Sequence, residues 1–164
     1  MAQSTTIKNF RDGTLVFADN TGTPLTLPIV YEAGDFSIDN LNEGLVETTA
    51  YLDRGVFATL RKTNAVFPAF SFSAHMTDLS DATDRLLYDL ARKTGAWTAA
   101  VSTLGANADA MTYKLTWTCE GSNFGDSADH TLIMNDCRIT ISLSEGDPNS
   151  FSVAGIVYGT ITAT

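Results

Sequence analysis

Apolar and polar residues alternate along much of the chain, in short runs that turn-forming residues separate. In the first third, Asp12-Gly13 divides two such runs, and similar turns follow at residues 19–22, 33–35 and 53–55. Asp-Gly is favoured in two-residue hairpin turns because both central residues need positive φ. Alternation with a period of two predicts strands that bury one face. We therefore predict short strands joined by tight turns in the first third of the chain.

The closing half of the chain shows the same alternation over longer runs. The apolar positions assigned to the buried faces of three long strands are Tyr113, Leu115, Trp117 and Cys119, then Cys137, Ile139, Ile141 and Leu143, then Phe151, Val153, Val157 and Ile161. The other face of the last strand is only partly polar, because Ile156 and Tyr158 lie on it. A face of this kind is expected to be partly covered.

One segment changes to a helical period. Apolar residues recur at positions 86, 87, 90 and 91, and Ser80 or Asp81 can cap the start. Basic residues occupy 92 and 93, and Gly95 suits the position after the end. Acidic residues at the start and basic residues at the end both favour the helix dipole. We predict a single amphipathic helix from about Asp81 to Thr94, lying across a sheet or the mouth of a barrel.

The segment Leu45–Arg61 is predicted to form an extended β-hairpin arm around the turn at residues 53–55. Neither face of this hairpin is cleanly apolar or polar, whereas a hairpin packed on one core alternates regularly. Two mixed faces indicate cover on both sides, either from the rest of the domain or from another subunit. The candidates for contact between subunits are Leu45, Val46, Tyr51, Leu52, Val56 and Phe57.

Together the elements predict one mainly β domain spanning residues 1–164. Its expected architecture is an antiparallel β-sandwich or partly closed barrel with one flanking α-helix. The sequence shows no internal repeat and no linker.

Composition and charge narrow the class of function. The chain has 164 residues, of which 44% are hydrophobic, and a net charge of −9 with a pI near 4.4. Proteins that bind nucleic acid neutralise phosphates with Lys and Arg, but the basic pairs here, at 61–62 and 92–93, are isolated. Residues 1–6 are polar, and no apolar stretch approaches the roughly 20 residues of a membrane span. We expect neither specific DNA binding nor a membrane span.

Candidate chemistry is sparse. Cys119 and Cys137 fall on apolar positions and are expected to be buried, reduced thiols. His75 and His130 are the only histidines, and no nucleophile elbow or phosphate-binding loop accompanies them. Asp126 and Asp129 beside His130 suit a polar loop better than a metal site. We expect no enzyme activity, cofactor or metal, and a hydrolase that uses either histidine is the weakest alternative.

The order of elements resembles the tail tube proteins of siphophage-type, long-tailed bacterial viruses. The resemblance covers most of the chain: the hairpin turn at 53–55, the Pro-containing run Val66-Phe67-Pro68-Ala69-Phe70-Ser71-Phe72, the single helix, and the paired long strands over residues 113–120, 139–147 and 151–159. The inner tube protein of type VI secretion systems shares the fold of that family.

This resemblance implies a structural protein of the virion tail. Six copies would form a ring, rings would stack into a hollow tube, and the arm would reach the neighbouring ring. The other expected partners are the tail terminator, tape measure and distal tail proteins, with assembly in the host cytoplasm. The family's lumen is usually acidic, which lets DNA pass without phosphate contacts. The lumen candidates are Glu32, Asp39, Glu43 and Glu47.

Two alternative functions are also consistent with these elements. A β-barrel that binds a small apolar ligand would need an internal cavity instead of a packed core, and the aromatic residues of the predicted strands would line it. A tail terminator or head-tail joining protein would form one ring and stop.

Overall fold

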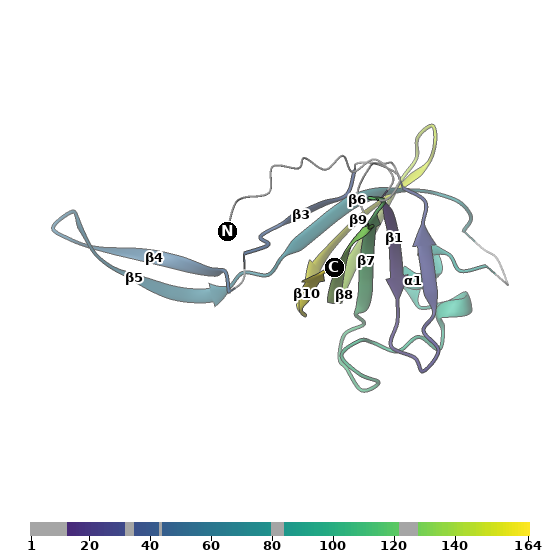
Figure 1. Ribbon diagram of the computed structural model, residues 1–164, viewed down its shortest axis with the longest axis horizontal. Coiled ribbons are helices and arrows are strands. Elements are labelled where there is room, and N and C mark those ends of the chain that lie inside the picture. The colour runs from purple at the N-terminus through teal and green to yellow at the C-terminus, as the bar shows by residue number, and fades with distance from the viewer. Residues whose placement is uncertain (1–12, 32–34, 43, 80–83, 122–127) are drawn as a thin grey trace.

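The computed structural model describes residues 13–31, 35–42, 44–79, 84–121 and 128–164. Figure 1 shows a β-rich body from which one long hairpin projects. The elements, in chain order, are β1 (Thr14–Ala18), β2 (Thr26–Ile29), β3 (Ser37–Asp39), β4 (Val46–Asp53), β5 (Val56–Ala65), β6 (Ala69–His75), α1 (Leu87–Arg92), the 3-10 helix η1 (Gly95–Trp97), β7 (Tyr113–Cys119), β8 (His130–Ser144), β9 (Ser150–Val157) and β10 (Ile161–Ala163).

The strands of the body form one antiparallel sheet in the order β2-β1-β7-β8-β9-β6-β3, and β10 pairs with β8. Strand β8 is long enough to pair with different strands along its two halves. Its first half pairs with β7 and β10, and its second half pairs with β9. Asp136, in the middle of β8, has a φ of 54°, and the pairing with β7 slips by one residue nearby. A bulge of this kind bends a strand, so β8 turns the sheet.

The bend folds the sheet over its own apolar face. Phe17 of β1 and Phe72 of β6 have ring centroids 6.3 Å apart, although three strands separate β1 from β6 in the sheet. The folded sheet stays open between the β2 segment and β6. There, Tyr31 and Ala74 form one isolated bridge. The prediction of a mainly antiparallel β fold with one α-helix is confirmed, and the sheet does not close into a barrel.

The core lies between the folded halves of the sheet and beneath α1 and η1. Alternating side chains of the strands point into this core, since β6 and β9 bury every second residue. The largest of its fully buried side chains are Trp97, Phe17, Leu15, Leu90, Leu115 and Met134. The buried hydrophobic residues of this interior belong to one packed cluster.

Helix α1 is shorter than the predicted helix over Asp81–Thr94. It begins at Leu87, and Leu86 before it is extended, with φ −110° and ψ 148°. Arg85 donates hydrogen bonds to the carbonyl and hydroxyl of Thr26, at 2.8 and 3.2 Å, which ties this segment to β2. The tie and the burial of Leu86 hold residues 85–86 out of the helix, and residues 80–83 lie outside the described part. The predicted end is close, since Lys93 is left-handed.

The predicted last strand is divided into β9 and β10. Phe151, Val153 and Val157 are buried on one face of β9, as predicted. Ile161 belongs instead to β10, opposite Met134 in the first half of β8. The chain turns between the two strands, where Gly159 donates to the carbonyl of Asn135 at 3.2 Å. A side chain at position 159 would meet the carbonyl of Asn135 within 2.8 Å, so the turn requires glycine.

Candidate assembly interface

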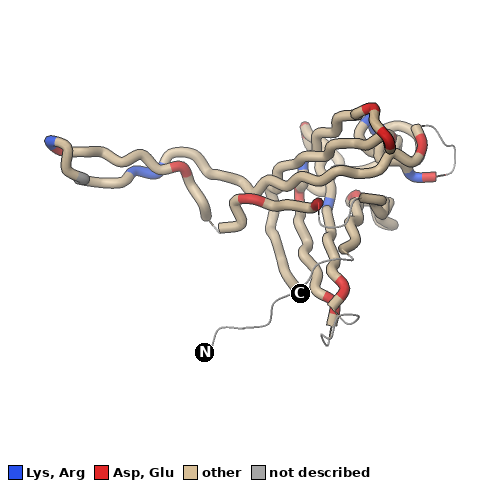
Figure 2. The backbone as a smooth tube through the Cα atoms, turned by 90° about the horizontal axis from the view of Figure 1, so that it is seen from above, with Lys and Arg blue, Asp and Glu red and all other residues tan. Residues whose placement is uncertain are grey.

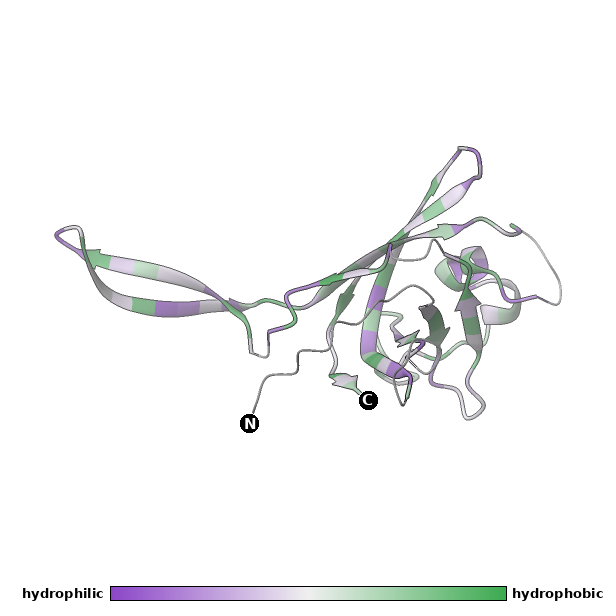
Figure 3. Cartoon of the chain, turned by 45° about the horizontal axis from the view of Figure 1, so that its top comes forward, coloured by the Kyte–Doolittle hydropathy of each residue, from purple (hydrophilic) through white to green (hydrophobic). Residues whose placement is uncertain are grey.

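The β4–β5 hairpin is the feature that sets this molecule apart from a plain β-sandwich. Its strands pair only with each other, as a separate two-stranded sheet. The turn uses Arg54 and Gly55, with φ of 48° and 82°, which suits a tight hairpin. In Figures 1 and 3 the hairpin extends away from the body. The predicted arm over Leu45–Arg61 is thus a hairpin, and its returning strand runs on to Ala65.

Both faces of the hairpin expose apolar side chains. Residues directly opposite each other in an antiparallel pair point to the same face. Ala50 opposes Leu60, so Leu60 and Leu52 share one face, and they are 53% and 63% exposed. Tyr51 and Val56 are 50% and 69% exposed, and each opposes a polar residue on the partner strand. Figure 3 shows apolar segments on both strands.

Polar contacts of the hairpin are local. The guanidinium of Arg61 lies 5.8 Å from the centre of the Tyr51 ring. Glu47 accepts hydrogen bonds from Asn64 at 3.0 Å and from Thr63 at 3.4 Å. An isolated two-stranded hairpin is marginally stable in water, and exposed strand edges are templates for pairing with another chain. The hairpin therefore gains stability when something covers it.

The base of the hairpin borders an apolar groove. Leu45 and Val46 are half-buried there, and Val66 donates to the carbonyl of Leu45 at 2.9 Å. Across the groove, the Phe67 and Tyr158 rings meet edge to face with centroids 4.9 Å apart, and each side chain is 42% exposed. The groove has a volume of about 500 Å³. No sequence pattern singled out Phe67, whereas the partly apolar outward face of the last strand pointed to Tyr158.

The outward face of β6, β9 and the second half of β8 adjoins this groove. It carries small side chains such as Ser71 and Ala154, together with Ile156, which is 41% exposed. Arg138 and Asp39 line a shallow hollow of about 490 Å³ on this face. Small side chains on this face suit close packing against another surface.

The four lumen candidates do not form one group in the described structure. Asp39 ends the edge strand β3 of the main sheet, whereas Glu47 lies near the base of the hairpin in the other sheet. Glu32 and Glu43 lie outside the described residues. Figure 2 shows acidic residues spread over the body of the molecule.

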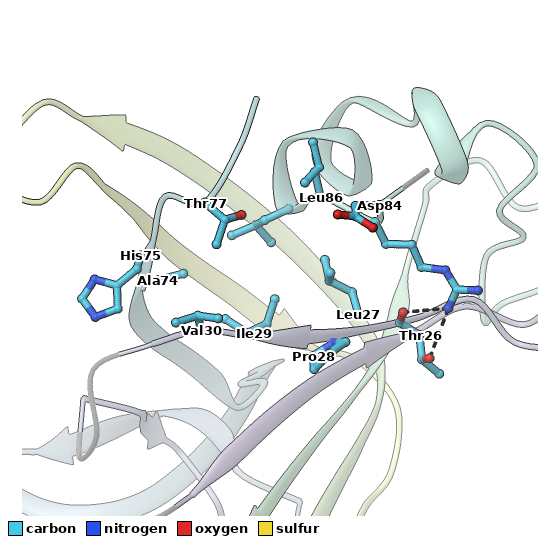
Figure 4. A pocket seen from close by; sticks show the side chains of 12 residues that line it. Thr26, Leu27, Pro28, Ile29, Val30, Ala74, His75, Thr77, Asp84 and Leu86 are labelled. Atoms are coloured by element: carbon cyan, nitrogen blue, oxygen red, sulfur yellow. Dashed lines mark hydrogen bonds between the residues drawn. The ribbon is translucent and has the colours of Figure 1, made fainter. Parts of the chain in front are cut away.

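A further hollow of about 600 Å³ lies at the seam where β2 diverges from β6 (Figure 4). Arg85 closes one end through its hydrogen bonds to Thr26, and His75 and Val30 lie toward the other end. His75 also anchors the seam through its backbone, which donates to the carbonyl of Val30 at 2.8 Å. Hydrogen bonds from Arg85 and His75 thus hold the β2 segment in place at this seam.

The candidate chemical groups are dispersed. His75 ends β6 and His130 begins β8, opposite Cys119. Asp129 accepts a hydrogen bond from the backbone of Gly121 at 3.1 Å, while Asp126 lies outside the described residues. In the part of the chain that the structure describes, no group of three or more His, Cys, Asp or Glu side chains is placed to hold a metal ion. No helix of the described residues is long and apolar enough to cross a membrane.

The fold has counterparts among extracellular contractile injection systems. It matches a chain of a sheath-tube complex, PVC, in the extended state, with 11% identity and a TM-score of 0.52, over 99% of both chains. It matches a chain of a PVC sheath/tube terminator structure with 10% identity and the same TM-score and coverage. A chain of the anti-feeding prophage baseplate gives 12% identity and a TM-score of 0.48, over 99% of this chain and 97% of the other.

These likenesses show a shared fold over the whole chain. No family model and no curated protein sequence matches the chain.

Proposed function

We propose that this protein is a structural subunit of a phage-type tail or injection tube, built from stacked rings of identical copies. The observation that carries the proposal is the β4–β5 hairpin, whose faces both expose large apolar side chains. The fold that bears it is shared with chains of sheath-tube assemblies over its full length. A hairpin of this kind on such a body is suited to contact between subunits.

In this role the protein acts by geometry and not by catalysis. Rings of six would stack to form a channel, and DNA would pass through without specific binding. A net charge of −9 supports that passage, because an acidic wall offers phosphates no contacts. Asp39 and Glu47 remain the lumen candidates among the described residues. The terminator, tape measure and distal tail proteins would complete the particle.

The direct test is negative-stain electron microscopy of the purified protein over a range of concentration and salt. Stacked hollow tubes with six-fold end views are expected. Phe57→Asp, or deletion of residues 50–59, is expected to leave a folded monomer that forms no tubes. Circular dichroism checks the fold of each variant, and Val30→Asp, at a 58% exposed apolar residue away from the hairpin, is the matched control. Normal tubes from the deletion variant would contradict the role of the hairpin.

A ring that does not stack is the second candidate function. One matching chain comes from a structure described as a sheath/tube terminator, and its TM-score equals that of the sheath-tube chain. The fold therefore does not separate the two roles. Single rings at every concentration would favour the terminator, and long tubes would favour the tube subunit.

A further inference from the structure

Exposed apolar side chains gather at two places on this molecule. Among the described residues, thirteen large hydrophobic side chains are exposed, and eight of them form two groups. The tip group, on the hairpin, is Tyr51, Leu52, Val56 and Leu60. The base group, at the groove and the adjoining sheet face, is Leu41, Phe67, Ile156 and Tyr158. Contiguous exposed apolar surface marks sites of interaction, whereas scattered single residues need no explanation.

The groove of the base group is chemically suited to the tip group. Its volume is about 500 Å³, and none of the described residues that line it is charged. Its walls include the Phe67–Tyr158 aromatic pair, the backbone beside Pro68, and Ile161 of β10. Insertion of Leu52 or Val56 would bury apolar surface from both sides.

The tip cannot reach the groove of its own chain. Strand β4 has eight residues, so the hairpin holds its turn roughly 26 Å from its base. The extended hairpin in Figure 1 points its tip away from the body. The tip and the groove of each molecule therefore lie at opposite ends of the hairpin. Only the tip of a second molecule can occupy the groove.

Charge favours a second copy of this chain as the occupant. The hairpin, residues 46–65, contains three basic and two acidic residues, so it carries +1 while the rest of the chain carries −10. Figure 2 shows the basic residues at the tip and along the hairpin. Two acidic bodies repel each other, whereas the hairpin is the part of one copy that an acidic body accepts.

We infer that the hairpin tip of one copy docks in the apolar groove at the hairpin base of the next copy. This inference rests on the proposed self-assembly and names the surface that receives the arm. The contact joins two different patches, so it is heterologous, and each bound copy presents a new groove and a new tip. Repetition of one contact then extends the assembly.

A heterologous contact makes a sharp prediction for mixed variants. Leu52→Asp blocks the tip and leaves the groove intact, whereas Leu41→Asp blocks the groove and leaves the tip intact. Each variant alone is expected to be monomeric by sedimentation velocity. An equimolar mixture is expected to give a dimer with one copy of each, because one intact tip meets one intact groove. Leu104→Asp, at a 56% exposed apolar residue in neither group, is the control and should assemble as the wild type does.

Crosslinking gives a second readout that needs no blocked variant. Leu52→Cys and Tyr158→Cys are introduced in separate chains, which are mixed and oxidised. The native Cys119 and Cys137 are buried and do not compete. A disulfide between the two chains is expected, and Leu104→Cys in place of Tyr158→Cys should give none.

The outcomes separate this inference from the proposed function. Wild-type tubes together with a mixture that stays monomeric and uncrosslinked would overturn the inference and leave the tube subunit standing. A monomeric wild type with a monomeric mixture would overturn both. A one-to-one dimer in the mixture, with the specific disulfide, would establish the contact.

Discussion

Asp19 is a buried carboxylate that joins three parts of the chain. It accepts hydrogen bonds from the backbone of Leu25 at 2.7 Å and of Val101 at 3.1 Å, and from the hydroxyl of Thr21 at 2.9 Å. A buried backbone donor that loses its acceptor costs about 1–3 kcal/mol. The carboxylate therefore fixes the β1–β2 turn against the loop that follows η1.

Removal of this carboxylate is expected to destabilise the body. Asp19→Ala should lower the free energy of unfolding by about 3 kcal/mol, because two backbone donors lose their acceptor. Urea unfolding followed by circular dichroism measures the change. The exposed Asp109→Ala is the control and should change stability by about 0.5 kcal/mol or less. Equal stability of the two variants would contradict this account.

Cys137 of β8 is fully buried in the core. Burial, with a contribution from Asp136, raises the pKa of the Cys137 thiol from 9.0 to about 12. The folded protein disfavours the thiolate. The contribution of this thiol to the free energy of unfolding is therefore fully present below pH 9 and is lost as the pH rises towards 12.

The thiol of Cys137 is expected to be inert in the folded protein near pH 8. In a Cys119→Ala background, labelling by a thiol reagent should be at least about 1,000-fold slower before unfolding than after it, because the thiolate is the reactive form. Adding Ser142→Cys, at an exposed site on β8, provides a fast-labelling control. Rapid labelling of native Cys137 would show that the interior is open to solvent.

At the scale of elements, β6 and β9 approach closely where Phe70 faces Gly155. The two residues are direct partners in the sheet. The Phe70 ring occupies the space that a side chain at 155 would need, and the carbonyl of Arg138 lies 2.9 Å from the same point. The glycine thus lets the aromatic ring pack flat on the sheet.

Gly155→Ala is expected to destabilise the body by about 1–3 kcal/mol, because overpacking forces the ring or the backbone to shift. A domain of this size should then melt roughly 2–12 °C lower. Differential scanning calorimetry measures the shift. Ser152→Ala on the exposed face of β9 is the control, and a shift no larger than that of the control would contradict the close approach.

At the scale of the whole molecule, net charge opposes self-association. Every copy carries −9, and the screening length falls from about 30 Å at 0.01 M salt to about 10 Å at 0.1 M. The attraction of a basic hairpin for an acidic body acts at short range, whereas repulsion between bodies acts first during approach.

Added salt is therefore expected to promote assembly. The concentration at which polymer appears, measured by light scattering, should fall as salt rises from about 0.01 to 0.15 M. The double variant Asp109→Asn with Glu145→Gln changes two exposed sites on the body and reduces the negative net charge from −9 to −7. It should weaken the dependence of assembly on salt. Assembly that weakens steadily with salt would mean that ion pairs between copies dominate the contact.

The sequence by itself determined the elements that depend on local periodicity and turn chemistry. Period-two alternation identified the buried faces of β7 and β9, and the turn at residues 53–55 located the hairpin. Lys93 and Gly95 marked the end of α1, since both take left-handed backbone that a helix end favours.

Only the tertiary structure decided what depends on contacts between distant residues. The tie from Arg85 to Thr26 shortens α1, and the bend at Asp136 divides the last strand into β9 and β10. The groove unites residues 41–42, 44–46, 65–68 and 157–161, which no local pattern connects. Local periodicity records which face of an element is buried, whereas the bend of a sheet depends on how its strands pair, and that pairing alone creates the groove.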